Sequence, residues 1–374
     1  MEAAFVLGDS TFVKGIGDTV GVEEEFHIVN GAAGALRPAA STLMLTPADV
    51  EPELQRTMIE TASVVCTDMA SLRTDLVRRR QRLIDAAGRS GLAVAASGSL
   101  PFSGEPVGRV YPKARYQWMY EEYRQIVVEQ QVCSCQVQVG VPDRDLAVRV
   151  CRRIRAWLPV LLALSASSPM FRRVDTGYAS YRTIAISRWP TVGPPPDFES
   201  AAEYDEAVST LVDSGVISDA GMIYYDARPS ARYPTVEIRI ADACPNIDDA
   251  VLLAALGRAL VVAAAAEDRA GHPLPSAAPV LVRAATWRAA RSGLEGDLLD
   301  PVTSRPAAAE AVVGALLDYL RPALTHHADW DLATDLSRAL LSRGTSSRRQ
   351  RALLHAGASD AGIVEAVVAE TAVA

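Results

Sequence analysis

The sequence predicts an α+β fold built around a mixed or antiparallel sheet. Strand-like and helix-like segments follow one another irregularly, which disfavours a doubly wound parallel sheet, and the last hundred residues are mainly helical. No internal repeat or low-complexity linker divides the 374 residues, and 49% hydrophobic content is enough to fill a core. We therefore expect one domain over 1–374, with a flexible N-terminus at 1–18 and a C-terminal tail helix at 356–374.

The first elements follow from the spacing of apolar side chains. Val20, Val22 and Phe26 alternate with polar residues as in a strand, whereas Leu72 and Leu76 recur at helical spacing. The predicted elements up to residue 141 are extended segments at 19–29, 53–66, 92–97 and 133–141, a hairpin turn at 31–34, and helices at 68–90 and 116–128.

The remaining elements are predicted in the same way. They are helices at 143–165, 201–214 and 248–266, an extended segment at 182–189, a rigid loop at 190–196, and strands at 222–225 and 235–240. Asp143 is the predicted N-cap of the first helix, and Asp248 or Asp249 that of the last. The apolar run 250–266 contains Arg258 and is short for a membrane span, so we expect a buried helix.

Composition excludes several classes of function. Only Lys14 and Lys113 are lysines among 37 basic residues, and neither ends a Walker A sequence. The net charge of −8 disfavours nucleic acid as a partner, and the arginine cluster 78–82 is expected to be a solvated helix face. Five cysteines without Cys-x-x-Cys spacing indicate buried free thiols in a reducing compartment. With no signal-peptide pattern, we expect a cytoplasmic protein that uses no membrane.

The strand 19–29 carries the first candidate site. Because alternate side chains of a strand share a face, Glu23 and Glu25 point together and Glu24 points away. Two adjacent carboxylates repel unless a cation lies between them, and hard oxygen ligands suit Mg²⁺. The alternative is an acidic edge strand that faces solvent.

The strand 235–240 carries the second candidate site. Glu237 and Arg239 share one face, opposite apolar neighbours, and such a pair could hold a metal and a phosphate or carboxylate together. A surface ion pair is the alternative. Glu60, a lone carboxylate between apolar neighbours, is either an exposed side chain or a buried ligand.

Two further segments carry polar side chains. Gln136 and Gln138 share a face with Ser134, opposite an apolar face, as in a strand that lines a funnel. Arg182 and Arg188 could grip carboxylate or phosphate oxygens, or could be ordinary surface arginines.

These residues together resemble a known family. Gly21–Phe26, Glu60, 175–196, 233–245 and the run Trp287-Arg288-Ala289-Ala290-Arg291 are similar, in this order, to the carboxylate–amine ligases of the glutamate–cysteine ligase type 2 family. The similarity extends over roughly residues 19–355. It implies a fold related to the catalytic domain of glutamine synthetase, in which a curved, largely antiparallel sheet forms a funnel with helices packed outside.

The resemblance also implies a mechanism. ATP would phosphorylate one small-molecule carboxylate, and an amine would displace phosphate from the acyl phosphate to give an amide. Glu23, Glu25, Glu60 and Glu237 match metal-binding glutamates for two or three Mg²⁺ ions, and Arg239 matches an arginine that stabilises the transferred phosphoryl group, so Glu237 and Arg239 are the expected catalytic pair. Expected to bind substrate or ATP are Gln138, Tyr181, Arg182, Arg188, Arg288 and Arg291. A homo-oligomer is expected by the same resemblance.

The chain departs from the family pattern at three histidines. Members carry His-x-His at the positions of Gln136 and Gln138, and Thr-His-Pro-Phe where this chain has Ser-Leu-Pro-Phe at 99–102. Gln136 could still offer Mg²⁺ a carbonyl oxygen. We therefore expect a ligase whose acid or amine is not glutamate or cysteine. The alternatives are an orthodox glutamate–cysteine ligase, and a relative that is weakly catalytic or non-catalytic, binds a partner, or runs another reaction on the same scaffold.

Overall fold

A computed structural model describes residues 12–31, 34–45, 50–106, 110–274 and 278–373. Its main sheet has seven strands in the order β2-β3-β1-β5-β9-β8, with β4 also paired to β1. Every pairing between the named strands is antiparallel, which confirms the predicted α+β class and its largely antiparallel sheet. The strands are β1 (Val20–Asn30), β2 (Glu51–Pro52), β3 (Met58–Ala62), β4 (Leu92–Ala95), β5 (Cys135–Gly140), β8 (Ala227–Pro229) and β9 (Thr235–Ile238).

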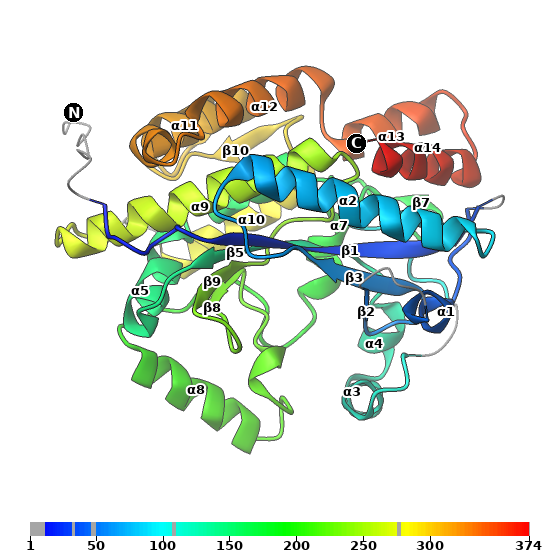
Figure 1. Ribbon diagram of the computed structural model, residues 1–374, viewed down its shortest axis with the longest axis horizontal. Coiled ribbons are helices and arrows are strands. Elements are labelled where there is room, and N and C mark those ends of the chain that lie inside the picture. Colours follow the sequence, from blue (N-terminus) through cyan, green and yellow to red (C-terminus); the bar gives the residue numbers. More distant parts are fainter. Residues whose placement is uncertain (1–11, 32–33, 46–49, 107–109, 275–277, 374) are drawn as a thin grey trace.

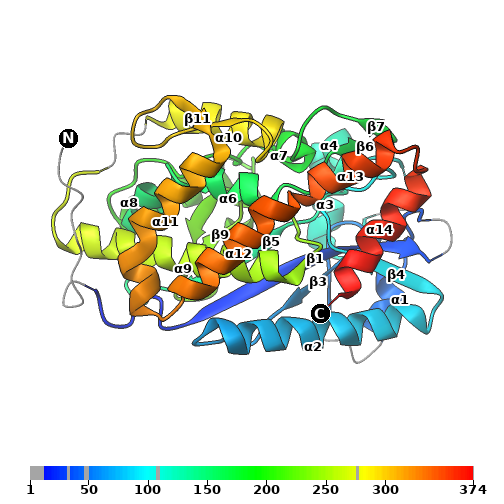
Figure 2. The same cartoon turned by 90° about the horizontal axis from the view of Figure 1, so that it is seen from above.

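Helices cover one face of this sheet. In Figure 1, β1 crosses the middle of the molecule with α2 and α9 directly above it and α11 and α12 above them; Figure 2 shows this cover from above. The helices of the cover are α2 (Met69–Gly88), α9 (Ile247–Arg269), α11 (Ala309–His326) and α12 (Trp330–Arg343). The other face of the sheet is flanked by short helices and loops and carries the polar side chains described below.

The core lies between α9 and the sheet. Val137 and Ile238 point toward α9, and a Cβ added at Gly257 would lie 3.1 Å from Cδ1 of Ile238, so glycine allows the close approach. The side chain of Asn246 caps α9 by accepting from the N–H of Asp248, and the predicted caps at Asp248 and Asp249 are therefore wrong. Helix α9 has the length and hydropathy of a membrane span, but its apolar stretch is entirely buried, as in a core helix.

The long helix predicted at 143–165 is interrupted. Asp143 caps α5 (Arg144–Ile154) as predicted, and a second helix, α6 (Leu158–Ser165), begins after three residues. Pro159 lies in the first turn of α6, the position in a helix where its missing N–H costs least. The predicted helix 116–128 is likewise divided into α3 (Ala114–Tyr123) and α4 (Gln125–Glu129) by the positive φ of Arg124.

Two predicted extended segments are wrong. Residues 181–186 form the helix α7 (Tyr181–Ile186), which begins where the Ser180 hydroxyl accepts from the N–H of Thr183. The segment 222–225 begins at the last residue of a turn of 3₁₀ helix, η2 (Ala220–Met222), and the strand lies later, at β8.

The remaining elements are outside the main sheet. They are α1 (Ala40–Met44), β6 (Met170–Phe171), β7 (Val174–Asp175), α8 (Ala201–Asp213), α10 (Pro279–Ser292), β10 (Asp297–Leu299), β11 (Pro306–Ala308), α13 (Ser346–His355) and α14 (Asp360–Ala372). The helix α14 corresponds to the predicted tail and packs on β4 and α2. Of the predicted flexible N-terminus, 1–11 lie outside the described residues, whereas Ile16 is buried in the core and Gly17 donates to the carbonyl of Gly140. Part of the turn predicted at 31–34 also lies outside them.

The five cysteines are buried and unpaired, as predicted. They are Cys66, Cys133, Cys135, Cys151 and Cys244.

Candidate active site

A cavity of about 1040 Å³ opens on the face of the sheet that is opposite α9. The strands β3, β1, β5, β9 and β8 form its floor, while the start of α3, the turn η2 and the loop 230–233 line its sides. Strand alternation explains the character of the floor, because the apolar side chains of these strands point to α9 and their polar side chains point into the cavity.

The strand register sets the polar side chains in a row across the floor. Residues directly opposite one another in an antiparallel pair project from the same face. The pairs across the floor are Glu60 with Glu25, Glu23 with Gln136, Gln138 with Glu237, and Glu237 with Arg228. Carboxylates therefore occupy the β3–β1 end, glutamines the middle and arginines the β9–β8 end.

Glu24 points the other way, as alternation predicted. It is buried against α2, where its carboxylate pairs with Arg80 and the Arg80 guanidinium also donates to the carbonyls of Cys244 and Pro245. Arg80 therefore does not belong to a solvated helix face, and β1 is a central strand rather than the acidic edge strand considered as the alternative.

The carboxylate end of the row has too little positive charge. Burial raises the pKa of Glu60 well above its usual value, and the neighbouring Glu53, Glu23 and Glu25 raise it further. Burial also raises the pKa of Glu23, with Glu237 adding to the effect, and the pKa of Glu53, with Glu25 adding to it. Hydrogen bonds join the Glu60 side chain to those of Glu23 and Glu53, so the cluster must share protons at neutral pH unless a cation balances it.

This donor set fits Mg²⁺ in chemistry. Carboxylate oxygens are the ligands that the ion prefers, and a cation would remove the repulsion that raises these pKa values. Across the described ranges, however, no three acidic, histidine or cysteine side chains are placed to hold one ion as they stand. Glu25 and Glu23 instead accept hydrogen bonds from side chains of β5 and from Ser134 directly before it.

Glu25 is held by the strand beside it. Its Oε2 accepts from the backbone N–H of Ser134 at 2.7 Å, and its Oε1 accepts from the Ser134 hydroxyl at 2.7 Å and from Nε2 of Gln136 at 2.9 Å. These three donors orient the carboxylate.

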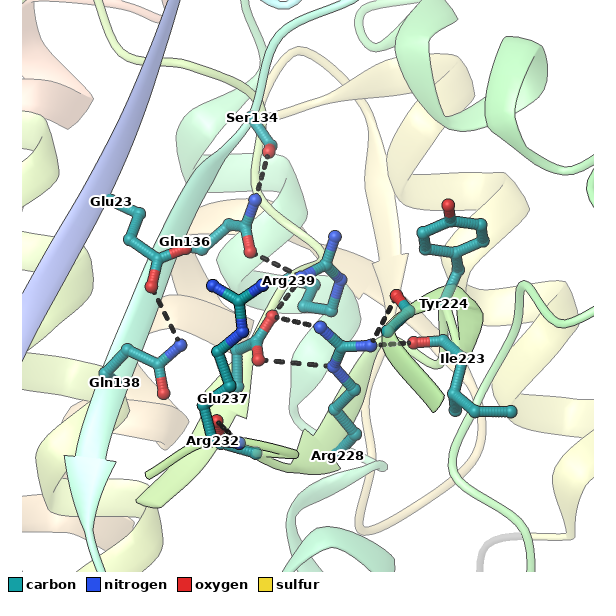
Figure 3. Close-up of polar contacts among 12 residues, drawn as sticks. Glu23, Ser134, Gln136, Gln138, Ile223, Tyr224, Arg228, Arg232, Glu237 and Arg239 are labelled. Carbon is teal, nitrogen blue, oxygen red and sulfur yellow. Dashed lines mark hydrogen bonds and ion pairs between the residues drawn. The ribbon is translucent and has the colours of Figure 1, made fainter. Parts of the chain in front are cut away.

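The orientation of Gln136 is fixed by its neighbours. The guanidinium of Arg239 can only donate, so it takes the amide oxygen of Gln136, and the amide NH₂ is left to face the carboxylate of Glu25. The carbonyl oxygen that we predicted as a metal ligand is therefore occupied by Arg239. Gln138 is oriented in the same way. Its Nε2 donates to Glu23 at 3.1 Å (Figure 3), and its oxygen accepts from the Thr235 hydroxyl.

Two guanidinium groups converge on Glu237. Arg228 makes a two-pronged contact to both carboxylate oxygens, at 3.2 and 3.1 Å, and Arg239 binds one of them (Figure 3). Burial alone would raise the pKa of Glu237, but Arg239 and Arg228 outweigh it and lower the pKa to about 2. Glu237 is therefore ionised at all physiological pH values, and it is not the surface ion pair considered as the alternative, because only 3% of the residue is exposed.

Comparison with known proteins assigns the family. The sequence model of the family described as "Glutamate-cysteine ligase family 2 (GCS2)" matches residues 19–370, which is most of the chain. The chain belongs to this family. A protein of Mycolicibacterium smegmatis provisionally named glutamate–cysteine ligase 2-2 is 46% identical over 98% of this chain and 92% of its own. One of Frankia alni, provisionally named glutamate–cysteine ligase 2-3, is 46% identical over 94% of this chain, which spans only 41% of that relative's length.

Solved structures share the fold at low sequence identity. A glutamate–cysteine ligase from Francisella tularensis in complex with AMP superposes with a TM-score of 0.66 at 12% identity, covering 97% of this chain and 90% of that one. A bifunctional glutathione synthetase from Pasteurella multocida superposes with a TM-score of 0.68 at 15% identity. The match covers 95% of this chain and 52% of that one. These similarities confirm the predicted fold.

Of the three positions at which the resemblance implies a histidine, two lie in the cavity and one does not. Gln136 and Gln138 lie in the middle of the floor. Leu100, by contrast, is fully buried in an apolar cluster with Phe102 and Val29, outside the cavity. The departure at Leu100 therefore leaves the polar row of this glutamate–cysteine ligase family member untouched.

Arg182 lines the cavity but is committed to the backbone. Its guanidinium donates to the carbonyls of Arg239 and Ile240, each at 3.1 Å, and so fixes the backbone just after β9 that carries the Arg239 side chain. Behind it the buried Asp242 accepts hydrogen bonds from the backbone N–H of Ser167 and from the hydroxyls of Ser168 and Ser180.

Four predicted binding residues lie outside the cavity lining. Arg188 pairs with Glu129 and donates to the carbonyl of Ala185. Tyr181 packs on aromatic rings, Arg291 donates to the carbonyl of Gly177, and Arg288 lies half-buried on α10. In the structure Arg188, Tyr181 and Arg291 contact surrounding segments, and the role of all four residues in binding substrate or ATP stays a prediction.

Several residues of the cavity could not be recognised from the sequence. Glu53 directly follows β2 and Asp226 directly precedes β8, so strand alternation gives no guidance for either, and Arg228 lies on a strand that was not predicted. Arg115 lines the cavity on α3, where it pairs with Asp219. Lys113, one of the two lysines, stands at the start of that helix and also lines the cavity, a position that its rarity alone did not reveal.

Proposed function

We propose that this chain is an ATP-dependent carboxylate–amine ligase that forms an amide through an acyl phosphate. A carboxylate is a poor acylating agent at neutral pH, and phosphorylation by ATP would supply the leaving group. The observation that carries the proposal is the charge order of the cavity floor, with carboxylates short of positive charge at one end and guanidinium groups at the other.

Each end of the floor suits one part of the reaction. Glu23, Glu25, Glu53 and Glu60 would hold Mg²⁺, which when bound neutralises phosphate charge and organises the nucleotide. Glu237 would contribute less to an ion than these four, because Arg228 and Arg239 already neutralise it. Arg239 has donors at the cavity surface beside this cluster, where it would stabilise charge on the transferred phosphoryl group.

We further propose that the acid or the amine differs from glutamate or cysteine. Support comes from Gln136 and Gln138, whose amides link Glu25 to Arg239 and Glu23 to Thr235 without an ionisable ring. A floor built this way presents a different charge to substrate than one containing two imidazoles. An orthodox glutamate–cysteine ligase remains the alternative outcome of the experiment below.

The experiment is a substrate panel. The protein is incubated with ATP, Mg²⁺ and pairs of acids and amines, including glutamate with cysteine, and phosphate release and product mass are followed. We expect amine-dependent ATP hydrolysis that Glu23→Gln and Glu237→Gln abolish while the protein stays folded. Survival of activity in both variants would refute the site, and nucleotide binding without turnover for any pair would favour the non-catalytic alternative.

A paired substitution tests the specialisation. Returning histidine at positions 136 and 138 (Gln136→His with Gln138→His) should increase formation of γ-glutamylcysteine relative to the preferred product. An unchanged product ratio would show that the two glutamines do not set specificity.

A further inference from the structure

Asp226 is a buried carboxylic acid at the wall of the cavity. It directly precedes β8, and its carbonyl accepts from the N–H of Arg239, which continues the β8–β9 ladder by one pair. Alternation places its side chain on the same face as that of Arg228, toward the cavity, while Ala227 between them points to the core. Only 7% of the residue is exposed.

The carboxyl group of Asp226 has no hydrogen-bond or ion-pair partner among the described residues. This sets it apart from the other buried acids nearby, since Glu237 binds two arginines and Asp242 accepts three hydrogen bonds. Its oxygens are not among the buried side-chain atoms that lack a partner, so they reach the cavity, where a ligand can complete their hydrogen bonding.

The charged groups around Asp226 are engaged elsewhere. Arg182 on α7 donates to the two backbone carbonyls that follow β9 and lies 3.8 Å from the Asp242 carboxylate, and Arg228 and Arg239 are bound to Glu237. Burial raises the pKa of Asp226 to about 7, and Arg182 opposes this only in part. The nearby Tyr224 stays neutral, because burial raises the pKa of its hydroxyl. Asp226 can therefore take up and release a proton near neutral pH.

We propose that Asp226 is the general base that deprotonates the amine substrate, an inference that rests on the proposed ligase function. An amine enters as an ammonium ion and has no lone pair until it loses a proton. One N–H proton passes to the Asp226 carboxylate, and the freed lone pair forms the C–N bond to the acyl phosphate. The C–O bond to phosphate then breaks with its electron pair leaving on phosphate, which takes the second N–H proton. The products are a neutral amide and hydrogen phosphate, and Asp226 returns its proton to solvent.

Asp226→Asn tests this assignment with two nucleophiles. The first is the amine identified in the panel above, and the second is hydroxylamine, which is already unprotonated at neutral pH and needs no base. With the ordinary amine we expect a loss of about 10²–10⁴-fold in kcat/KM, the usual contribution of a general base. With hydroxylamine the variant should keep wild-type activity. The acidic limb of the wild-type pH–rate profile should be absent in the variant.

Two controls separate a chemical role from a structural one. Asp205 is a half-exposed aspartate on α8 that pairs with Arg144 of α5, so Asp205→Asn should leave both reactions unchanged. The melting temperature of Asp226→Asn should not fall, because the change removes a buried charge without removing a bond.

Each other outcome overturns the assignment. Equal losses with both nucleophiles would place Asp226 in the structure or in the phosphoryl step, and unchanged activity with both would show that it takes no part. If wild type forms no amide with any pair, the proposed function fails first and the base assignment fails with it. Amide formation by wild type together with an unaffected variant leaves the proposed function intact and refutes Asp226 alone.

Discussion

Replacing Glu237 by glutamine should cost about 3 kcal/mol of stability at pH 7. Two guanidinium groups lower the pKa of this carboxyl from 4.5 to about 2. A tenfold change in acidity is worth about 1.4 kcal/mol, so the ionised form gains about 3 kcal/mol in the folded protein relative to the neutral form. Glutamine has the shape of the neutral form and loses this gain. Solvent screening reduces the figure little, because Glu237 is almost fully buried.

The pH dependence gives the prediction its sign. A carboxyl whose pKa is lowered by folding stabilises the protein above its unfolded pKa, and this contribution disappears as the pH falls through the folded pKa. The stability difference between wild type and Glu237→Gln should therefore fall from about 3 kcal/mol at pH 7 to about 2 kcal/mol at pH 3.5. Urea unfolding followed by circular dichroism, without nucleotide or Mg²⁺, measures both values.

A matched control is available in an exposed ion pair. Glu199 binds Arg152 but is 64% exposed, so Glu199→Gln should cost less than about 1 kcal/mol at either pH. A cost below about 1 kcal/mol for Glu237→Gln, or one that does not change between the two pH values, would refute the claim that the arginines determine the charge of Glu237. A total stability of about 5–15 kcal/mol leaves the variant folded, so its loss of activity can be tested separately.

Three further outcomes follow from the same contacts. Folding raises the pKa of Glu60, so ionisation of this carboxyl destabilises the cation-free protein as the pH rises above the pKa of the unfolded chain. Glu60→Gln should therefore raise the melting temperature at pH 8 and reduce the stabilisation of the protein by Mg²⁺. An unchanged melting temperature would contradict the repulsion among the carboxylates. Arg80→Met should cost about 3–5 kcal/mol in urea unfolding, and adding Glu24→Gln should recover part of it, since the lone buried carboxylate is the main penalty. Arg188→Ala should change kcat/KM less than about twofold in steady-state assays, because Arg188 lies outside the cavity; a large loss would return it to the site.

The faces of the strands could be predicted from the sequence because alternation is a local property. Glu23 and Glu25 were separated from Glu24, and Glu237 and Arg239 were placed opposite the apolar side chains, by strand geometry alone. The family resemblance then added the curved, largely antiparallel sheet with helices packed outside, which no local pattern contains.

The features that the sequence did not reveal depend on distant partners. Arg80 has the spacing of an exposed arginine, and its burial follows from Glu24, 56 residues away in the chain. The helix α7 was missed because the cap at Ser180 was not recognised within an apparently extended segment. Asp226 lies just before a strand, so its direction is set by the pairing with Arg239 rather than by its own neighbours.

The pairing of Arg80 with Glu24 also bears on how the sheet assembles. Three consecutive glutamates on β1 could pair with the neighbouring strands in a register shifted by one residue, which would exchange the two faces. That register would place Glu23 and Glu25 against the helical layer, where Arg80 could neutralise only one of them, and would leave Glu24 alone in the cavity. In the shifted register one buried glutamate would have no positive partner. Arg80 thus favours the observed register of the cavity floor, although it lies on the opposite face of the sheet, outside the cavity.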